Sequence, residues 1–234
     1  MKRALVVCLG EVYTSSPNYD TFSSLPNKTR IVQLLSSKGW DTIDPVMEWD
    51  ATKSNVKASL TQLLSLTRSG DCLLFYYNGH AEKNYAGAGE TGTDDSGDEF
   101  LVTYSDYISR ADIPMPSSVC FLDNEYYDLL FNFFNVHRDR FLISIFDCCY
   151  SAGMVDAELR SLPNHMVLNS SSESVSSWTS ANDGSYFTKA LCFEAGQSTS
   201  IDELFQRTAK ALTDQGFPSP VFIRGALPAG TFII

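Results

Sequence analysis

Two stretches of the sequence place a reactive side chain directly after an apolar run. Residues 141–147, Phe-Leu-Ile-Ser-Ile-Phe-Asp, lead into Cys148 and Cys149. Residues 71–77, Asp-Cys-Leu-Leu-Phe-Tyr-Tyr, lead through Asn-Gly to His80. A thiol and an imidazole are the minimum for nucleophilic cysteine chemistry, because the imidazole takes the thiol proton and the thiolate attacks a carbonyl carbon. The pattern therefore predicts a cysteine nucleophile served by a histidine base.

Both apolar runs are typical of strands that are buried on both faces, as in the centre of a parallel sheet. In open α/β sheets, ligands and chemistry collect at the carboxyl ends of the strands, which is where both reactive groups stand. Gly79 lets the backbone turn sharply and present His80, whereas the other two histidines, His137 and His165, are expected in polar connections. Adjacent positions at a strand end point to opposite sides, so only one of the two neighbouring thiols can face a cleft.

The rest of the sequence predicts a sheet to which both of these strands belong. Apolar runs and helical periodicities alternate in the order strand, helix, strand, helix, strand along residues 3–9, 26–38, 40–46, 54–68 and 71–77. This alternation predicts a parallel sheet with right-handed crossovers and helices on both faces. Further helices are expected at residues 123–134 and 200–214, and further strands at 141–147, 166–168 and 220–223.

Composition favours one globular domain spanning residues 1–234 with an ordinary hydrophobic fraction of 44%. The net charge of −11 disfavours nucleic acid and anionic membranes as partners and suits cations or basic peptides. The apolar run after Met1 is shorter than a signal-peptide core, and no stretch is long enough to span a membrane. We therefore expect a soluble, cytoplasmic monomer with six reduced cysteines.

Residues 82–97 form the longest polar and glycine-rich stretch, and acidic residues follow one another closely at its end. The carboxylates are those of Asp94, Asp95, Asp98 and Glu99. Taken by itself, this stretch fits a solvated acidic loop as well as it fits a cation site.

The two strand-end motifs resemble those of the caspase-like cysteine peptidases, in particular the metacaspases and their prokaryotic relatives. Those enzymes carry Tyr-Ser-Gly-His-Gly and Asp-Cys-Cys-His-Ser-Gly where this chain has Tyr-Asn-Gly-His-Ala and Asp-Cys-Cys-Tyr-Ser-Ala. The departures are Asn78, Ala81, Tyr150 and Ala152, and none of them replaces the cysteine or the histidine. The resemblance implies a caspase-like three-layer sandwich with a mostly parallel central sheet of about six strands.

The resemblance makes Cys149 the nucleophile and leaves Cys148 an inert core thiol. His80 is then the general base and later the acid for the leaving amine, with the Gly79 and Cys149 amides as oxyanion donors. Strand alternation points Asp147 into the same cleft, where a carboxylate would pair with a cationic substrate side chain. By resemblance, the pocket for Arg or Lys consists of Asn78, Asp106 and Asp147.

Calcium is the cofactor that the resemblance implies, because many metacaspases depend on it. Calcium takes six to eight oxygen ligands in irregular geometry. The candidate ligands are Asp94, Asp95, Asp98, Glu99, Asp106 and Asp156. Arg160, in the connection after the cysteine strand, is a candidate site of autocleavage.

The sequence thus favours a cysteine endopeptidase that cleaves protein or peptide substrates after Arg or Lys. A catalytically silent caspase-like scaffold that binds basic peptides is the alternative, since Tyr150 and Ala152 depart from the family motif. A redox or metal role for Cys148 and Cys149 is weaker, because adjacent cysteines form a strained disulfide and no further ligand has metal spacing.

Overall fold

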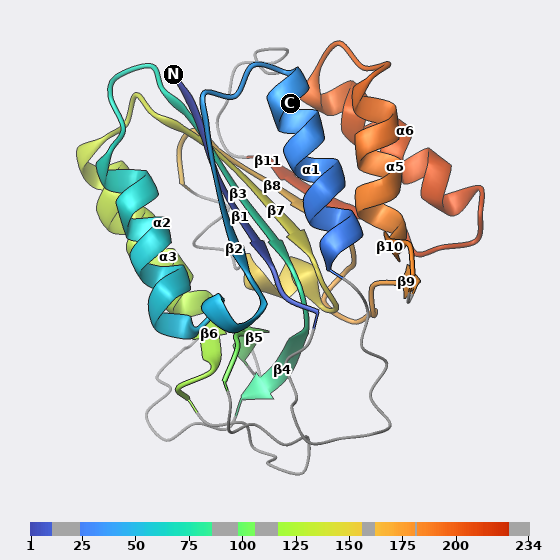
Figure 1. The fold of residues 1–234 in the computed structure, drawn as a ribbon, viewed down its shortest axis with the longest axis horizontal. Helices are drawn as coiled ribbons and strands as arrows, with labels where there is room; N and C mark the ends of the chain where they lie inside the picture. Colours follow the sequence, from blue (N-terminus) through green and yellow to red (C-terminus); the bar gives the residue numbers. More distant parts are fainter. Residues whose placement is uncertain (11–23, 86–97, 106–116, 156–161, 181, 225–234) are drawn as a thin grey trace.

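The computed structural model describes residues 1–10, 24–85, 98–105, 117–155, 162–180 and 182–224. A six-stranded sheet crosses the molecule between two layers of helices (Figure 1). Its strands lie in the order β11-β8-β7-β3-β1-β2, and all neighbours pair in parallel except β11, which is antiparallel to β8. Their bounds are β1 Lys2–Cys8, β2 Thr42–Met47, β3 Cys72–Asn78, β7 Phe141–Asp147, β8 His165–Asn169 and β11 Val221–Arg224.

Two helical layers cover the sheet because its central strands are apolar on both faces. One layer contains α1 (Leu25–Ser37), α5 (Tyr186–Ala195) and α6 (Ile201–Thr213), and the other contains α2 (Lys53–Ser65) and α3 (Asp123–Val136) (Figure 1). Side chains of β3 alternate between the layers: Tyr76 packs toward the first and Tyr77 toward the second. The predicted α/β class, with a mostly parallel six-stranded sheet and helices on both faces, is confirmed.

A second, three-stranded sheet lies at the carboxyl ends of the main strands (Figure 1). It contains β4 (Ala81–Tyr85), β5 (Asp98–Val102) and β6 (Cys120–Leu122), all antiparallel. Most of β4 falls in residues 82–97, which were expected to be a polar loop because a short polar strand has no apolar alternation. The short elements are η1 (Glu48–Asp50), η2 (Ser151–Met154), β9 (Thr179–Ser180) and β10 (Gly184–Ser185).

His165 is the one histidine whose setting was predicted wrongly. We expected it in a polar connection, but it opens β8, where it pairs in register with Leu142 and is 2% exposed. Its Nε2 atom lies 2.9 Å from the Ser144 hydroxyl, so a core hydrogen bond accommodates the ring. This histidine is thereby removed from the candidates for a catalytic base.

All six cysteines are free thiols. Within the described ranges, no helix has the length and apolar character needed to cross a membrane.

Candidate active site

The register of β3 and β7 brings the two predicted catalytic segments to the same place. These parallel strands are neighbours, and Asn78 pairs with Asp147 at their last positions. The chains that continue to His80 and Cys149 therefore leave the same edge of the sheet side by side. Cys148 is 2% exposed and packs into the apolar cluster under α2 and α3, whereas Cys149 is half-buried.

Cys149 lies in surroundings that favour its neutral thiol. Burial raises the pKa of this thiol, and the carboxylates of Glu82 and Asp147 raise it further, while hydrogen bonds with Ser177 and Ser176 lower it. The Cys149 Sγ atom lies 4.0 Å from the Ser177 carbonyl oxygen, consistent with a weak S–H donor. A thiol of this kind reacts only when a base removes its proton.

His80 is held through its backbone on the side facing β5. Its carbonyl oxygen accepts a hydrogen bond from the Val102 amide at 2.9 Å and lies 2.8 Å from the Tyr77 hydroxyl. A Cβ atom added to Gly79 would lie 2.5 Å from that same hydroxyl. The Gly-His turn and the buried Tyr77 side chain therefore fit only with a glycine at this position.

The Gly79 amide is not directed at the cleft, contrary to the expectation that it donates to an oxyanion. It donates to the Asp147 carbonyl oxygen at 3.4 Å and so extends the ladder between β3 and β7. The next candidate is Ala81, which pairs with Leu101 across β4 and β5. Because the Val102 amide bonds the His80 carbonyl, Ala81 and Leu101 form a non-hydrogen-bonded pair, and the Ala81 N–H is not used by this ladder.

We expect Tyr77→Phe to slow any chemistry at His80 several-fold and to destabilise the fold by about 1–2 kcal/mol. The Tyr77 hydroxyl lies 2.8 Å from the His80 carbonyl and 2.7 Å from the Val102 carbonyl, and its loss removes the one O–H donor that these two carbonyl oxygens share. Steady-state kinetics and urea unfolding would measure the two effects. Unchanged kcat with lowered stability would show that Tyr77 supports the fold alone.

Asp147 is buried on the face covered by α5. It is 2% exposed, and its carboxylate accepts hydrogen bonds from the Ser185 hydroxyl at 2.7 Å and the Thr188 hydroxyl at 2.6 Å. Burial raises the pKa of Asp147 to about 6, although these hydroxyl donors oppose the rise. A carboxylate whose pKa is raised mainly by burial lacks a compensating cation.

Asn78 belongs to the same buried network as Asp147. Its side-chain Nδ2 donates to the Asp147 carbonyl at 3.1 Å, and its Oδ1 accepts from Asn27 Nδ2 at 2.8 Å. Asn27 Oδ1 in turn accepts from the Ser185 amide at 2.9 Å. The structure therefore brings Asn78 and Asp147 together, and it adds three partners that sequence reasoning missed, namely Asn27, Ser185 and Thr188.

The predicted metal ligands divide into one described side chain and several that lie outside the described residues. Glu99 is 5% exposed and packs beneath the turn after Cys149, where a Cβ on Gly153 would lie 2.3 Å from Glu99 Cδ. Asp98 belongs to β5, but its side chain is not described. Within the described part of the chain, no three His, Cys, Asp or Glu side chains are grouped to hold a metal. Outside the described residues lie Asp94, Asp95, Asp106, Asp156 and the predicted autocleavage residue Arg160.

Exposed aromatic residues lie next to the segment that contacts Cys149. Trp178 follows Ser177 and is 57% exposed, and its ring centre lies 6.0 Å from that of Phe217. Tyr186 stacks on Phe217 with 4.2 Å between the ring centres. These rings form an apolar surface close to the thiol, which the scattered positions in the sequence did not reveal.

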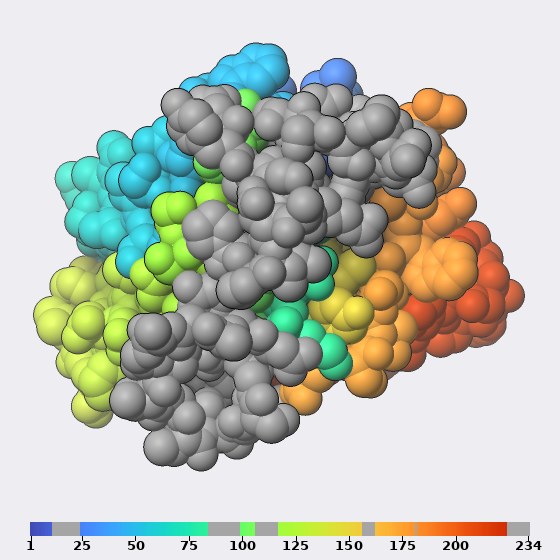
Figure 2. Space-filling view, turned by 90° about the horizontal axis from the view of Figure 1, so that it is seen from below, coloured from blue at the N-terminus to red at the C-terminus, as the bar shows by residue number. Residues whose placement is uncertain are grey.

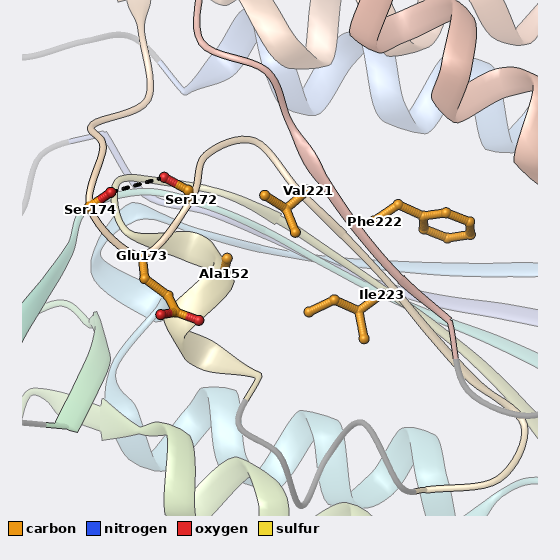
Figure 3. Close-up of a pocket in the computed structure, with 7 residues that line it drawn as sticks. All are labelled: Ala152, Ser172, Glu173, Ser174, Val221, Phe222 and Ile223. Atoms are coloured by element: carbon orange, nitrogen blue, oxygen red, sulfur yellow. Dashed lines mark hydrogen bonds between the residues drawn. The ribbon is translucent and has the colours of Figure 1, made fainter. Parts of the chain in front are cut away.

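A hollow of about 640 Å³ lies beside η2, the turn that follows Cys149, with Ala152 of this turn among its lining residues (Figure 3). Ala152, the serine-rich segment around Glu173, and the edge strand β11 line it, as the close-up shows. Neither His80 nor Cys149 is among the lining residues. The hollow is therefore separate from the candidate catalytic cleft.

A parallel α/β sheet that ends in a Gly-His turn and a Cys-Cys turn on neighbouring strands defines the class of caspase-like folds. The chain belongs to the Caspase domain family, whose sequence profile matches residues 2–226, and it is accordingly a caspase-family cysteine peptidase domain. No curated protein matches the chain in sequence.

Solved structures with low sequence identity share this fold. Protein GSU0716 from Geobacter sulfurreducens superposes with a TM-score of 0.71 at 14% identity, covering 99% of this chain and 96% of that one. Caspase-1 from Spodoptera frugiperda superposes with a TM-score of 0.60 at 14% identity, covering 94% of this chain and 85% of that one. At such identity the likeness concerns the fold alone.

Proposed function

We propose that this protein is a cysteine endopeptidase that cleaves peptide bonds after Arg or Lys. The observation that carries the proposal is the pairing of Asn78 with Asp147, which places the turns bearing His80 and Cys149 side by side. The burial of Cys148 leaves Cys149 as the thiol available to a substrate.

In the proposed reaction, His80 removes the proton from Cys149, and the thiolate attacks the carbonyl carbon of the scissile bond. His80 then returns the proton to the leaving amine, and water hydrolyses the acyl-enzyme. The Cys149 amide and the Ala81 amide are the proposed donors to the oxyanion, with Ala81 in place of the Gly79 of the sequence analysis. Removing such a donor typically costs about 10²–10³ in kcat.

The preference for a basic P1 residue rests on Asp147 and its neighbour Asn78. Asp147 is buried and held only by neutral hydroxyl donors in the described part of the site. An Arg or Lys side chain would supply the missing counter-charge, whereas an acidic P1 residue would face a second carboxylate in a desolvated place. Asp106 stays a proposed third member of this pocket by resemblance.

A panel of fluorogenic peptides that differ only in the P1 residue tests this proposal. We expect hydrolysis with Arg and Lys, and at least tenfold lower kcat/KM with Leu, Asp and Glu. These side chains lack the positive charge that would pair with Asp147, and a loss of ~1.4 kcal/mol in transition-state binding lowers the rate tenfold. Preferred cleavage after Asp would contradict the pocket assignment while leaving the peptidase class intact.

The second candidate function is a catalytically silent scaffold that binds basic peptides. The observation in its favour is the raised pKa of the Cys149 thiol, which results first from burial and then from Glu82 and Asp147. Tight binding of the Arg peptides without hydrolysis, together with a thiol that resists alkylation, would favour this function.

We also propose that calcium activates hydrolysis, with Asp94, Asp95, Asp98, Asp106 and Asp156 as ligands. The proposal is supported by the spacing of these carboxylates and by the resemblance to metacaspases, while the buried Glu99 is the weakest member of the set. Bound calcium would supply positive charge that relieves the repulsion among them.

We expect millimolar calcium to raise hydrolysis of an Arg peptide several-fold over chelator, and Asp95→Asn and Asp156→Asn to abolish the increase. Glu173→Gln, which removes a carboxylate outside the set, is the control. Full activity in chelator with both variants unaffected would contradict calcium activation. Autocleavage at Arg160 stays a prediction, which a single uncleaved band in an active preparation would contradict.

A further inference from the structure

Tyr150, the residue directly after Cys149, has a left-handed backbone with φ 52° and ψ 24°. A bulky residue rarely adopts this conformation, so contacts must stabilise it. The Tyr150 amide donates to the Val175 carbonyl at 3.2 Å, and its own carbonyl accepts from the Gly153 amide at 3.0 Å. The turn therefore fixes the direction in which the chain leaves Cys149.

The ring of Tyr150 contacts the segment that follows His80. Lys83 Nζ lies 5.0 Å from the centre of the Tyr150 ring, within the range of a cation–π interaction. Lys83 belongs to β4, which begins at the buried Ala81 directly after His80. Figure 2, which shows the molecule from the side where the strands end, has the teal segment that contains Lys83 beside the yellow segment after Cys149.

The position of this contact matters because the main sheet no longer fixes the two chains beyond Asn78 and Asp147. The last bond of the ladder, from the Gly79 amide to the Asp147 carbonyl, is already long at 3.4 Å. After it, one chain turns into β4 and the other into η2. A contact between the side chains of Lys83 and Tyr150 therefore joins the two diverging segments just past the catalytic pair.

We propose that Lys83 and Tyr150 are positioning residues, whose contact sets the separation of the His80 imidazole and the Cys149 thiol. The inference rests on the proposed peptidase function, but neither residue touches the reacting atoms. It also concerns a position at which this chain departs from the metacaspase motif, because Tyr150 stands where those enzymes have histidine.

The positioning role predicts a change in the pH at which the Cys149 thiol ionises, because charged groups surround this thiol. Glu82 and Asp147 both act to raise the pKa of Cys149, and His80 is the proposed base. Lys83 is the cation that follows Glu82 in β4 and lies over the ring next to Cys149. Because the contact with Tyr150 is proposed to position His80, removing Lys83 should move the base away from the thiol, which should then ionise at higher pH.

We expect Lys83→Met and Tyr150→Leu each to lower kcat about two- to fivefold with little change in KM, the size typical of losing a cation–π contact whose cation is exposed. Both should shift the pH profile of Cys149 alkylation by iodoacetamide toward higher pH. Lys83→Arg, which keeps the cation, and Tyr150→Phe, which keeps the ring, should behave like the unmodified protein.

Two further variants separate positioning from folding. Tyr150→Gly adopts the left-handed turn without steric cost, so it removes the ring alone and should be as slow as Tyr150→Leu. The double variant Lys83→Met/Tyr150→Leu should be no slower than either single variant, since both remove one contact. Additive losses, or an unshifted alkylation profile in the single variants, would overturn the inference.

The alkylation profile needs no peptide hydrolysis. If the unmodified protein cleaves no peptide, the proposed function fails, yet a profile that depends on Lys83 and Tyr150 would still support their positioning role.

Discussion

Cys149→Ala should abolish peptide hydrolysis, with a fall of about 10⁴-fold or more in kcat/KM, whereas Cys148→Ala should retain most of it. Loss of a nucleophile removes the covalent step itself, and such losses commonly reach this size. The two cysteines differ in where the strand end directs them. Cys148 is 2% exposed within the cluster under α2 and α3, while Cys149 is half-buried beside Ser177.

The adjacent pair makes each cysteine the matched control for the other. Hydrolysis of an Arg peptide and mass spectrometry after iodoacetamide treatment would measure activity and labelling in both variants. Labelling of the peptide that contains residues 148 and 149 should vanish in Cys149→Ala and persist in Cys148→Ala. Equal activity in the Cys149→Ala protein would rule out Cys149 as the nucleophile, and inactivity of a folded Cys148→Ala protein would contradict the assignment of Cys148 as an inert core thiol.

The central strands could be predicted from the sequence because their burial on both faces produces continuous apolar runs. Residues 71–77 and 141–147 read as strands, and the structure has β3 and β7 within one residue of these limits. The order of strands and helices then restricted the topology to a parallel sheet. The prediction of a cysteine and a histidine at neighbouring strand ends depended on this burial pattern together with the two motifs.

Features that depend on register could not be predicted. Gly79 stood in the right segment to donate to an oxyanion, but only the pairing of β3 with β7 shows that its amide bonds the Asp147 carbonyl. His165 looked like a loop residue because only tertiary contact with Ser144 accommodates it in the core. The β4 segment was missed because it is polar, and only its pairing with β5 shows that it is a strand.

The hydrogen-bond network around Asp147 could not be predicted from the sequence for a related reason. Asn27 lies in the first turn of α1 and Ser185 caps α5, and they meet only because both helices cover the same face of the sheet. A glycine with φ 77° precedes Ser185, and a Cβ there would lie 2.3 Å from Asn27 Oδ1. The resemblance of residues 184–191 to the family's Gly-x-Phe-Thr motif indicates a helix start there, but nothing in the sequence indicates that the helix cap binds Asp147.

Asp147→Asn should stabilise the protein at pH 7 by up to about 3 kcal/mol and weaken its preference for a basic P1 residue. Burial raises the pKa of Asp147 to about 6 from its usual 3.8, so the folded state binds the proton more tightly than the unfolded state. A pKa difference of this size corresponds to ~3 kcal/mol. An asparagine carries no charge to desolvate, and its amide can donate to the Thr188 hydroxyl while its oxygen accepts from Ser185.

The sign of this effect is specific to a carboxyl group with a raised pKa. The stability contributed by Asp147 is fully present below about pH 4 and is lost as pH rises through about 6. The stability difference between Asp147→Asn and the unmodified protein should therefore grow between about pH 4 and 6 and stay constant above this range. Asp183→Asn is the matched control, because Lys189 and Arg30 lower the pKa of Asp183 and its contribution is instead lost on acidification. Urea unfolding of both variants between pH 2 and 7 should show the Asp147 effect between about pH 4 and 6 and the Asp183 effect only below about pH 4.

A carboxylate that lowers stability at neutral pH is expected to persist where a ligand supplies the missing charge, since burial without a counter-charge is otherwise unfavourable. The stabilised Asp147→Asn protein should therefore lose most discrimination between Arg and Leu at P1, while Asp183→Asn keeps it. The discrimination of the unmodified protein should itself decline below about pH 6, as Asp147 takes up its proton. An Asp147→Asn protein that is more stable yet equally selective for Arg would show that the buried carboxylate has no part in the pocket.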